Sequence, residues 1–308
     1  MKIAAIDLGT NTFHLIIAEK LNDKMDIIYK TNKPIKLGED ITKENKIIPA
    51  AFERGINCLK EFKATLGKYE ITQIRAVATS GVRSASNGQG FIDTVLKETG
   101  ITIEIIDGEE EAKLIYEGVK YSGAIQGKSL IMDIGGGSTE FIFCDEQGLY
   151  WKKSFDIGAA RLMQKFFKSD PISLAHQEHI KNHLQENLSP LIEFGRTFGA
   201  TTLIGSAGAF ETYAEMINPS IDIHQIAKAH IDTKAYQLLS KKLINATHQE
   251  RSEMPNLIPL RVDMIVMASM ITDYVLSELD LKAITLSTYD LKMGVLQGLA
   301  QNSPPKTP

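Results

Sequence analysis

An apolar run, an aspartate, a small polar loop and a second apolar run follow one another twice in this chain. The first copy, IAAIDLGTNTFHLIIAE, runs from Ile3 to Glu19, and the second, SLIMDIGGGSTEFIFCD, runs from Ser129 to Asp145. Each copy predicts two strands joined by a tight turn. Because one supersecondary unit is repeated, the chain is expected to consist of two related halves.

Elsewhere, strand patterns alternate with helical patterns. The strand-like runs IRAVATS and ITIEII are each followed by a helical pattern, and TTLIGSAGAFETYAEM reads as a strand, a glycine turn and a helix. The remainder is expected to be mainly helical up to a last strand, AITLST, and a last helix, DLKMGVLQGLA. Alternating strands and helices are typical of an α/β protein, so each half is expected to be a sheet with flanking helices.

The chain length of 308 residues suits two domains. The glycine-bearing polar segment Tyr121–Lys128 is the expected boundary, which gives an N-terminal domain of residues 1–124 and a C-terminal domain of residues 125–308. The sequence leaves open whether the last helix packs on the second domain or returns to pack on the first. Residues 302–308, which end in SPPKTP, are expected to be a disordered tail.

Composition narrows the class of protein. With a formal net charge of −4 the chain as a whole repels polyanions, so no nucleic-acid partner is expected and any anionic ligand needs a locally basic path. No apolar stretch is long enough to span a membrane, and Met1 leads directly into a strand pattern, so no signal peptide is expected. Cys58 and Cys144 are typical of buried thiols rather than of a disulfide or metal site. These features predict a cytoplasmic protein.

The two repeated loops have the composition of phosphate-binding turns. Glycine allows a ligand to approach the backbone closely, successive amides in such a turn form an anion-binding concavity, and the hydroxyl groups add donors. Two hairpin turns are the alternative, since Asn and Gly are common there, but an aspartate precedes both loops. The phosphate-binding residues predicted are Gly9, Thr10, Asn11 and Thr12 in the first loop and Gly135, Gly136, Gly137 and Ser138 in the second.

The aspartates themselves, Asp7 and Asp133, each follow an apolar run, of four residues before Asp7 and three before Asp133. A carboxylate at the edge of a phosphate-binding loop is a typical ligand for a metal ion that also binds phosphate oxygens. Glu140 begins the second strand of the second copy. It is either a third carboxylate of this site or a residue that faces solvent.

A third acidic candidate lies in the helical segment DGEEEAKLIYEGV. Acidic residues are favoured in a first helical turn by the helix dipole, and Glu109 has the spacing to pair with Lys113. Glu111 instead shares its helix face with Leu114 and Ile115, the apolar side. An inward carboxylate without a local cation is costly unless it has a function, so Glu111 is the predicted functional residue.

The segment ATSGVRSASN places Thr79, Ser80 and Arg83 just after a strand. An arginine among hydroxyl groups at a strand end suits bidentate phosphate binding; the alternative is a surface arginine in a salt bridge. Weaker signals are the glycine turn IGSAGAF, which close packing explains as well as nucleotide binding, and Arg161 one turn into a helix. His14 is expected to be a packed histidine.

Together these motifs resemble the exopolyphosphatase / guanosine pentaphosphate phosphatase (Ppx/GppA) family. DLGTNTFHLIIAE is similar to its first phosphate loop and DIGGGSTEF to its second. The order and spacing of the family are matched by ATSGVRSASN, IIDGEEEAKLIYEGV, IGAARL, RVDMIV and LSTYDLKMGVL. The resemblance covers Lys2 to Leu299.

This resemblance implies a duplicated ribonuclease-H-like fold of the actin, sugar kinase and heat-shock-70 superfamily, with the active site in the cleft between two domains. It implies hydrolysis of the terminal phosphoanhydride of inorganic polyphosphate, or of the 5′ γ-phosphate of pppGpp, by a protein that is commonly a homodimer. Glu111 matches the family's catalytic glutamate and Arg83 its phosphate-binding arginine. Asp133 and Glu140 match its magnesium-linked residues, so the expected cofactor is Mg²⁺, held with the help of Asp7.

The chain departs from the family pattern in three ways. Ala209 stands where the third glycine turn usually has Thr, Lys292 stands where the last motif usually has Arg, and the C-terminal helical domains of long members are missing. Three rival functions are therefore kept: a pppGpp phosphatase, an ATP-dependent kinase of the superfamily, and a sensor that binds a phosphorylated ligand without turnover. A pure sensor has no need of a base, which argues against the last of these.

Overall fold

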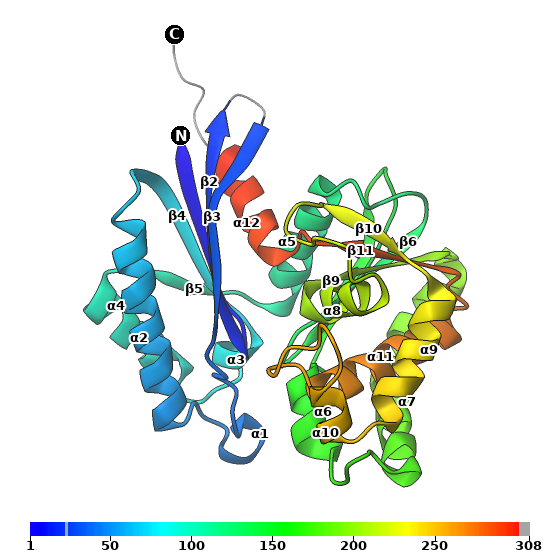
Figure 1. The fold of residues 1–308 in the computed structure, drawn as a ribbon. Coiled ribbons are helices and arrows are strands. Elements are labelled where there is room, and N and C mark those ends of the chain that lie inside the picture. The colour runs from blue at the N-terminus through cyan, green and yellow to red at the C-terminus, as the bar shows by residue number, and fades with distance from the viewer. Residues whose placement is uncertain (22–23, 302–308) are drawn as a thin grey trace. The chain divides into compact units, whose positions relative to one another are not determined.

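The computed structural model describes residues 1–21 and 24–301, and the chain divides into two compact units (Figure 1). Unit 1 comprises Met1–Gly118 and Leu291–Pro308, of which residues 291–301 are described, and unit 2 comprises Val119–Asp290. Each unit has a sheet and a hydrophobic core of its own. The predicted tail at residues 302–308 lies outside the described residues. No helix in the described part of the chain has both the length and the apolar character of a membrane span.

Unit 1 contains a five-stranded sheet in the order β3-β2-β1-β4-β5. Its strands are β1 (Lys2–Leu8), β2 (Thr12–Leu21), β3 (Lys24–Pro34), β4 (Ile71–Ala78) and β5 (Ile103–Ile105). Its helices are α1 (Ile41–Glu44), α2 (Pro49–Leu66), α3 (Ser80–Arg83), α4 (Gly88–Thr99), α12 (Leu291–Gln301) and most of α5 (Gly108–Tyr121).

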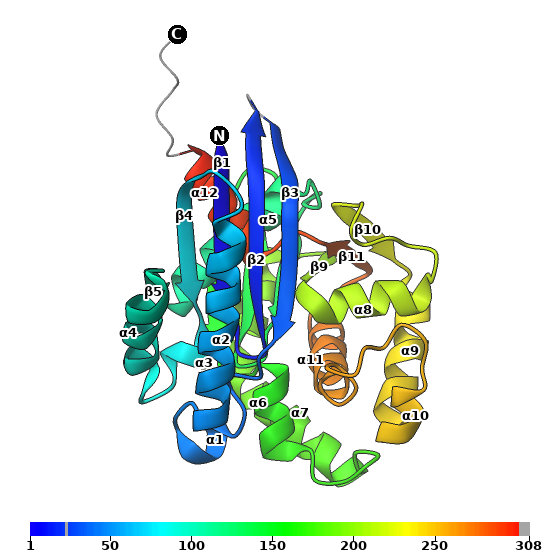
Figure 2. The same ribbon diagram turned by 60° about the vertical axis from the view of Figure 1, so that its left-hand side comes forward.

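Strand β1 is buried on both faces, which explains why its sequence is a continuous apolar run. Ala4, Ile6 and Leu8 point into the core that α2 and α4 cover. Ile3 and Ala5 point to the opposite face and are equally buried, because α12 packs against β1 there (Figures 1 and 2).

The return of α12 to unit 1 is supported by close contacts at both ends of the helix. A Cβ at Gly294 would stand 1.8 Å from the carbonyl oxygen of Leu114 in α5, so only glycine fits at this crossing. Near the C-terminal end, the ammonium group of Lys20 donates to the carbonyl oxygen of Ala300 at 2.6 Å. The last helix therefore packs on the first unit, the second of the two options left open by the sequence.

Unit 2 contains a six-stranded sheet in the order β10-β11-β9-β6-β7-β8. Its strands are β6 (Ser129–Ile134), β7 (Thr139–Cys144), β8 (Leu149–Phe155), β9 (Thr202–Ser206), β10 (Lys228–Ile231) and β11 (Ala283–Ser287). Its helices are α6 (Ala159–Phe166), α7 (Leu174–Phe198), α8 (Ala207–Ile217), α9 (Thr233–Asn245), α10 (His248–Ser252) and α11 (Met264–Glu278). Strand β10 was not predicted, because its four residues lie in a region whose pattern is mainly helical.

The two sheets share one topology. Strands β1, β2, β3, β4 and β5 correspond to β6, β7, β8, β9 and β11: in each sheet the first strand pairs antiparallel with the second and parallel with the fourth. Strand β10 is an extra edge strand, antiparallel to β11. The predicted fold class, a duplicated α/β fold, is therefore confirmed, and the repeated motif forms the first hairpin of each sheet.

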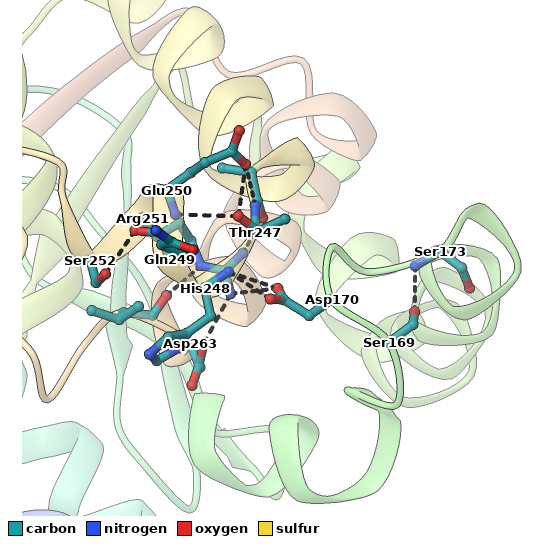
Figure 3. Close-up of polar contacts among 12 residues, drawn as sticks. Ser169, Asp170, Ser173, Thr247, His248, Gln249, Glu250, Arg251, Ser252 and Asp263 are labelled. Atoms are coloured by element: carbon teal, nitrogen blue, oxygen red, sulfur yellow. Dashed lines mark hydrogen bonds and ion pairs between the residues drawn. The ribbon is translucent and has the colours of Figure 1, made fainter.

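A buried arginine organises the loops around α10 in unit 2 (Figure 3). Arg251 has no exposed surface. Its guanidinium contacts Asp263 at 2.9 Å and Asp170 at 3.2 Å, and donates to the carbonyl oxygens of Val262, at 2.7 Å, and of Ala246. A buried charge is tolerated when it is paired and hydrogen-bonded in this way, so this cluster has a structural explanation.

Candidate functional site

The two predicted phosphate loops form the same turn. In the first, the amide of Gly9 donates to the carbonyl oxygen of Thr12 at 3.1 Å; in the second, the amide of Gly135 donates to that of Ser138 at 3.0 Å. A Cβ on Gly9 would lie 2.9 Å from the Thr12 oxygen, and one on Gly135 3.0 Å from the Ser138 oxygen. Glycine is therefore required at the same point of both turns by the close approach of the chain to itself.

Three carbonyl groups of the second loop accept hydrogen bonds from residues at the start of α6. Three successive loop carbonyls each accept a hydrogen bond from a backbone amide at 2.9–3.2 Å. The pairs are Gly135 with Ala159, Gly136 with Arg161, and Gly137 with Gly158. Because a planar trans peptide places its N–H opposite its C=O, the amides of Gly136, Gly137 and Ser138 all face away from α6. Consecutive amides with a common direction form a binding site for an anion.

The first loop is held similarly, by a segment that the sequence reading missed. The carbonyl oxygen of Asn11 accepts from the amides of Ile35 and Lys36, each at 2.8 Å, and that of Thr10 accepts from the amide of Gly38 at 2.9 Å. The amides of Asn11 and Thr12 consequently face away from this segment. The only sequence signal was Gly38, where a Cβ would lie 2.3 Å from the methyl group of Thr10.

The residues that follow β4 lie against the first loop. Strand β4 is parallel to β1 and pairs Ala78 with Leu8, so both strands end at the same edge of the sheet. A Cβ on Gly81 would approach the Cα of Thr10 to 2.8 Å. The hydroxyl group of Ser80 is buried and has no hydrogen-bond partner among the described residues. A buried polar atom of this kind marks a position for an absent ligand or water.

Glu111 and Arg83 form an ion pair in unit 1. The Nη1 of Arg83 donates to Oε2 of Glu111 at 2.9 Å and to the carbonyl oxygen of Ile106 at 2.9 Å. Glu111 is only 6% exposed. Burial raises the pKa of Glu111 above its ordinary value, and the Arg83 guanidinium opposes this rise. The sequence argument that Glu111 lacks a cation was therefore wrong: its partner comes from α3, far away in the sequence.

Glu110, in the same helical turn, is more exposed than Glu111. Lys113 contacts Glu110 at 4.0 Å. Glu110 also contacts Arg75 of β4 at 3.4 Å. Because Arg75 lies on β4 and not on α5, the spacing of residues along the helix could not predict its contact with Glu110.

Unit 2 carries a row of four polar side chains across four adjacent strands. Register places Ser154 of β8 opposite Glu140 of β7, Glu140 opposite Asp133 of β6, and Asp133 beside Ser206 of β9. The hydroxyl of Ser154 donates to Oε1 of Glu140 at 2.6 Å, and that of Ser206 donates to Oδ2 of Asp133 at 2.5 Å. All but Ser154 are buried. Glu140 therefore does not face solvent; its role as a metal ligand stays a prediction.

The donor set in this row fits a hard cation. Asp133 and Glu140 are cross-strand neighbours, whose Cβ atoms typically lie about 5 Å apart, and carboxylate oxygens are the ligands that Mg²⁺ prefers. Within the described residues, no single group of three or more His, Cys, Asp or Glu is arranged to hold a metal ion. Asp7, the third predicted ligand, belongs to unit 1, where it occupies the position that corresponds to Asp133 and pairs in register with His14.

The third glycine turn has a packing explanation. A Cβ on Gly205 would overlap the ring of Phe210 at 2.0 Å, and one on Gly208 would lie 2.1 Å from the guanidinium of Arg261. Between them, Ala207 has a φ of 64°, a conformation that costs energy for a residue with a side chain. The turn thereby carries Ser206, which contacts Asp133, so it contributes to the acidic row.

A model of the Ppx/GppA phosphatase family matches residues 16–303. The chain belongs to the Ppx/GppA phosphatase family. It is accordingly a phosphatase. This confirms the resemblance seen in the sequence motifs.

Solved structures of the Ppx/GppA family show the same fold. The chain is 37% identical to an exopolyphosphatase from Cytophaga hutchinsonii, with a TM-score of 0.95 and 99% of both chains covered. It is 25% identical to the Aquifex aeolicus member of the Ppx/GppA family, with a TM-score of 0.84 and again 99% of both chains covered.

A curated relative is longer. The chain is 32% identical, over 96% of its length, to a bifunctional 3-dehydroquinate synthase/phosphatase from Fusobacterium nucleatum. It spans only 46% of the length of that protein.

Proposed function

We propose that this phosphatase is an exopolyphosphatase, which hydrolyses the terminal phosphoanhydride of inorganic polyphosphate and releases orthophosphate in a Mg²⁺-dependent reaction. The observation that carries the proposal is the buried ion pair of Glu111 and Arg83, in the same unit as a turn whose amides are arranged for an anion. The likeness to the Cytophaga exopolyphosphatase supports this choice of substrate.

The phosphate groups are held by the backbone of both turns. The amides of Gly136, Gly137 and Ser138 in unit 2, and those of Asn11 and Thr12 in unit 1, have the common directions described above. The hydroxyl groups of Thr10 and Ser80 add donors in unit 1, whereas that of Thr79 donates to the carbonyl oxygen of Leu8 at 3.4 Å. Such fixed donors bind phosphate oxygens in the substrate and need no reorganisation to do so.

Arg83 has capacity for phosphate in addition to its contact with Glu111. Its two side-chain hydrogen bonds in unit 1 both come from Nη1. A guanidinium carries five N–H donors in a planar fork, so Nη2 and Nε are left for phosphate oxygens. The same side chain then fixes the orientation of Glu111 and binds the substrate.

Glu111 is the proposed general base. A base works best when its pKa lies near the working pH, and burial moves the pKa of Glu111 in that direction. Its carboxylate accepts the proton of a water molecule, whose oxygen forms the new bond to the terminal phosphorus. The bond from that phosphorus to the bridging oxygen breaks, and the shortened polyphosphate leaves.

Asp133 and Glu140 of unit 2 are the proposed magnesium ligands; Asp7 of unit 1 remains an expectation from its matching position in the repeat. When bound, Mg²⁺ would neutralise charge on the phosphate oxygens. Ser206 donates to Asp133 and Ser154 donates to Glu140, and these hydrogen bonds restrain the orientation of the two carboxylates. A homodimer in the cytoplasm remains an expectation from the family resemblance.

Phosphate release from polyphosphates of defined length, from pppGpp and from ATP with an acceptor tests the proposal, each with and without Mg²⁺. We expect release of orthophosphate from the polyphosphates, with loss of turnover in excess chelator. Preferential hydrolysis of pppGpp would replace the proposed substrate by the guanosine pentaphosphate. Transfer from ATP to the acceptor would refute hydrolysis as the reaction.

A further inference from the structure

Arg161 makes contacts that its place in a surface helix does not require. Its backbone amide donates to the carbonyl oxygen of Gly136 at 3.0 Å, and its side-chain Nε donates to that of Gly137 at 2.9 Å. One residue thus holds two successive peptides of the second phosphate loop. The guanidinium also contacts Asp156 at 3.4 Å, a residue whose side chain is 75% exposed.

Gly158 adds a second, independent restraint on the same loop. Its amide donates to Gly137 at 3.2 Å. A Cβ on Gly158 would lie 2.5 Å from backbone atoms of both Gly136 and Gly137. Such distances are far below van der Waals contact, so any side chain here would push the loop away from the start of α6.

We infer that Arg161 is a positioning residue for phosphate binding: with the Gly158 backbone it fixes the peptide planes of the second loop, so that the amides of Gly136, Gly137 and Ser138 point together at a phosphate group. This inference rests on the proposed function. It attributes the orientation of the loop's peptide planes to Arg161, a residue outside the loop. Arg161 does this through Nε and the Gly137 carbonyl, and not through its charge on the substrate.

The chemistry of the side chain separates these two roles. Arg161→Lys keeps the positive charge but has no Nε–H at the position that meets the Gly137 carbonyl. Gly158→Ala leaves Arg161 unchanged and displaces the loop sterically. If the peptide planes matter, both variants weaken phosphate binding. If the charge matters, Arg161→Lys binds as wild type.

Two matched controls accompany them. Asp156→Asn removes the exposed ion pair but leaves the contact between Arg161 and Gly137. Arg196→Lys makes the same chemical change in the same unit, at an exposed arginine whose partner is Glu278 at 3.1 Å.

The experiment is a titration of the folded, full-length variants with inorganic phosphate, followed by NMR through the amide signals of Gly136 and Gly137. Mn²⁺ affinity and polyphosphate kinetics are measured on the same samples. We expect about a tenfold loss of phosphate affinity in Arg161→Lys and Gly158→Ala, the size of one net hydrogen bond from a charged donor. KM for polyphosphate rises by about as much while kcat is nearly kept, as for loss of uniform binding. Mn²⁺ affinity and both controls stay at wild-type values.

Wild-type phosphate affinity in Arg161→Lys overturns the inference and leaves the proposed function standing. A wild-type protein that neither hydrolyses polyphosphate nor binds phosphate overturns the proposed function, and this inference with it. If Arg161→Lys does not fold, the inference is tested by comparing the phosphate affinity of Gly158→Ala with that of the Asp156→Asn control. An unchanged phosphate affinity in Gly158→Ala then refutes the role of the loop geometry.

Discussion

Replacement of Glu111 by Gln removes one proton acceptor from the site and little else. Gln has nearly the same size, and its side-chain carbonyl can accept the hydrogen bond that Arg83 Nη1 now donates at 2.9 Å. Because Glu111 is 6% exposed, water cannot readily substitute for the lost carboxylate. Glu111→Gln therefore tests the proposed base without opening a cavity in unit 1.

General base catalysis contributes roughly 10²–10⁴ in rate, so kcat for polyphosphate should fall by that factor. Binding of polyphosphate should hold or tighten, because a negative charge beside a polyanion is gone. In the wild type the acid limb of the pH–rate profile should lie above about 4.3, the ordinary pKa of Glu, since burial raises the pKa of Glu111. This limb should be lost in the variant.

Glu110→Gln is the matched control. Glu110 lies in the same helical turn and also pairs with an arginine, Arg75, at 3.4 Å, but its side chain is 33% exposed. The control thus loses an arginine-paired carboxylate that has no proposed part in the chemistry. Its kcat should change at most a few-fold. If Glu111→Gln turns over polyphosphate as fast as Glu110→Gln, the base is another residue and the mechanism must be redrawn.

The raised pKa of Glu111 also makes a prediction about the free energy of unfolding. Between the unfolded pKa of about 4.3 and the raised folded value, the folded state binds more protons, so wild-type stability falls as the pH rises through this window. Gln does not titrate. The free energy of unfolding of Glu111→Gln, relative to that of the wild type, should therefore increase from pH 4 to pH 7. Urea unfolding of both proteins at the two pH values measures this difference. A constant difference between the two proteins would contradict the assigned shift.

Three other perturbations have defined outcomes. Asp133→Asn should abolish most activity and weaken the Mg²⁺ dependence of the remainder, whereas full wild-type activity in excess chelator would exclude a metal role. Polyphosphate binding should weaken as salt rises, because an anionic ligand must be held by local positive charge on a chain of net charge −4; a dissociation constant independent of salt would argue against this. Gly294→Ala should destabilise the fold, since its Cβ would lie 1.8 Å from the Leu114 oxygen, while Gly298→Ala in the same helix meets nothing within 4 Å and should stabilise it by up to about 1 kcal/mol. Equal effects in denaturant unfolding would refute the crossing at Gly294.

The sequence predicted the parts of the site that depend on local spacing. Asp7 with Gly9, and Asp133 with Gly135, have the same separation, and the structure gives both pairs the same turn and the same register on the central strand. The alternation of strands and helices was enough for the fold class. Both features are set by residues close together in the chain, which is where sequence patterns are informative.

The remainder depends on contacts between distant segments. No pattern near Glu111 shows that Arg83 will reach it, and no pattern near Gly137 shows that Arg161 will hold its carbonyl. Helix α12 is compatible with either unit by composition, and Gly294 acquires its meaning only when Leu114 lies against it. Such contacts follow from the packing of whole elements, which a single sequence does not specify.

The two units share a fold but differ in the side chains at equivalent strand positions. In unit 2, Asp133 pairs in register with Glu140; in unit 1 the corresponding pair is Asp7 and His14. The repeated turn gives each unit backbone amides arranged for an anion, whereas the cross-strand pair of carboxylates is present in unit 2 alone. A single water attacks a single phosphorus, so one base is enough, and the proposed base comes from α5 alone.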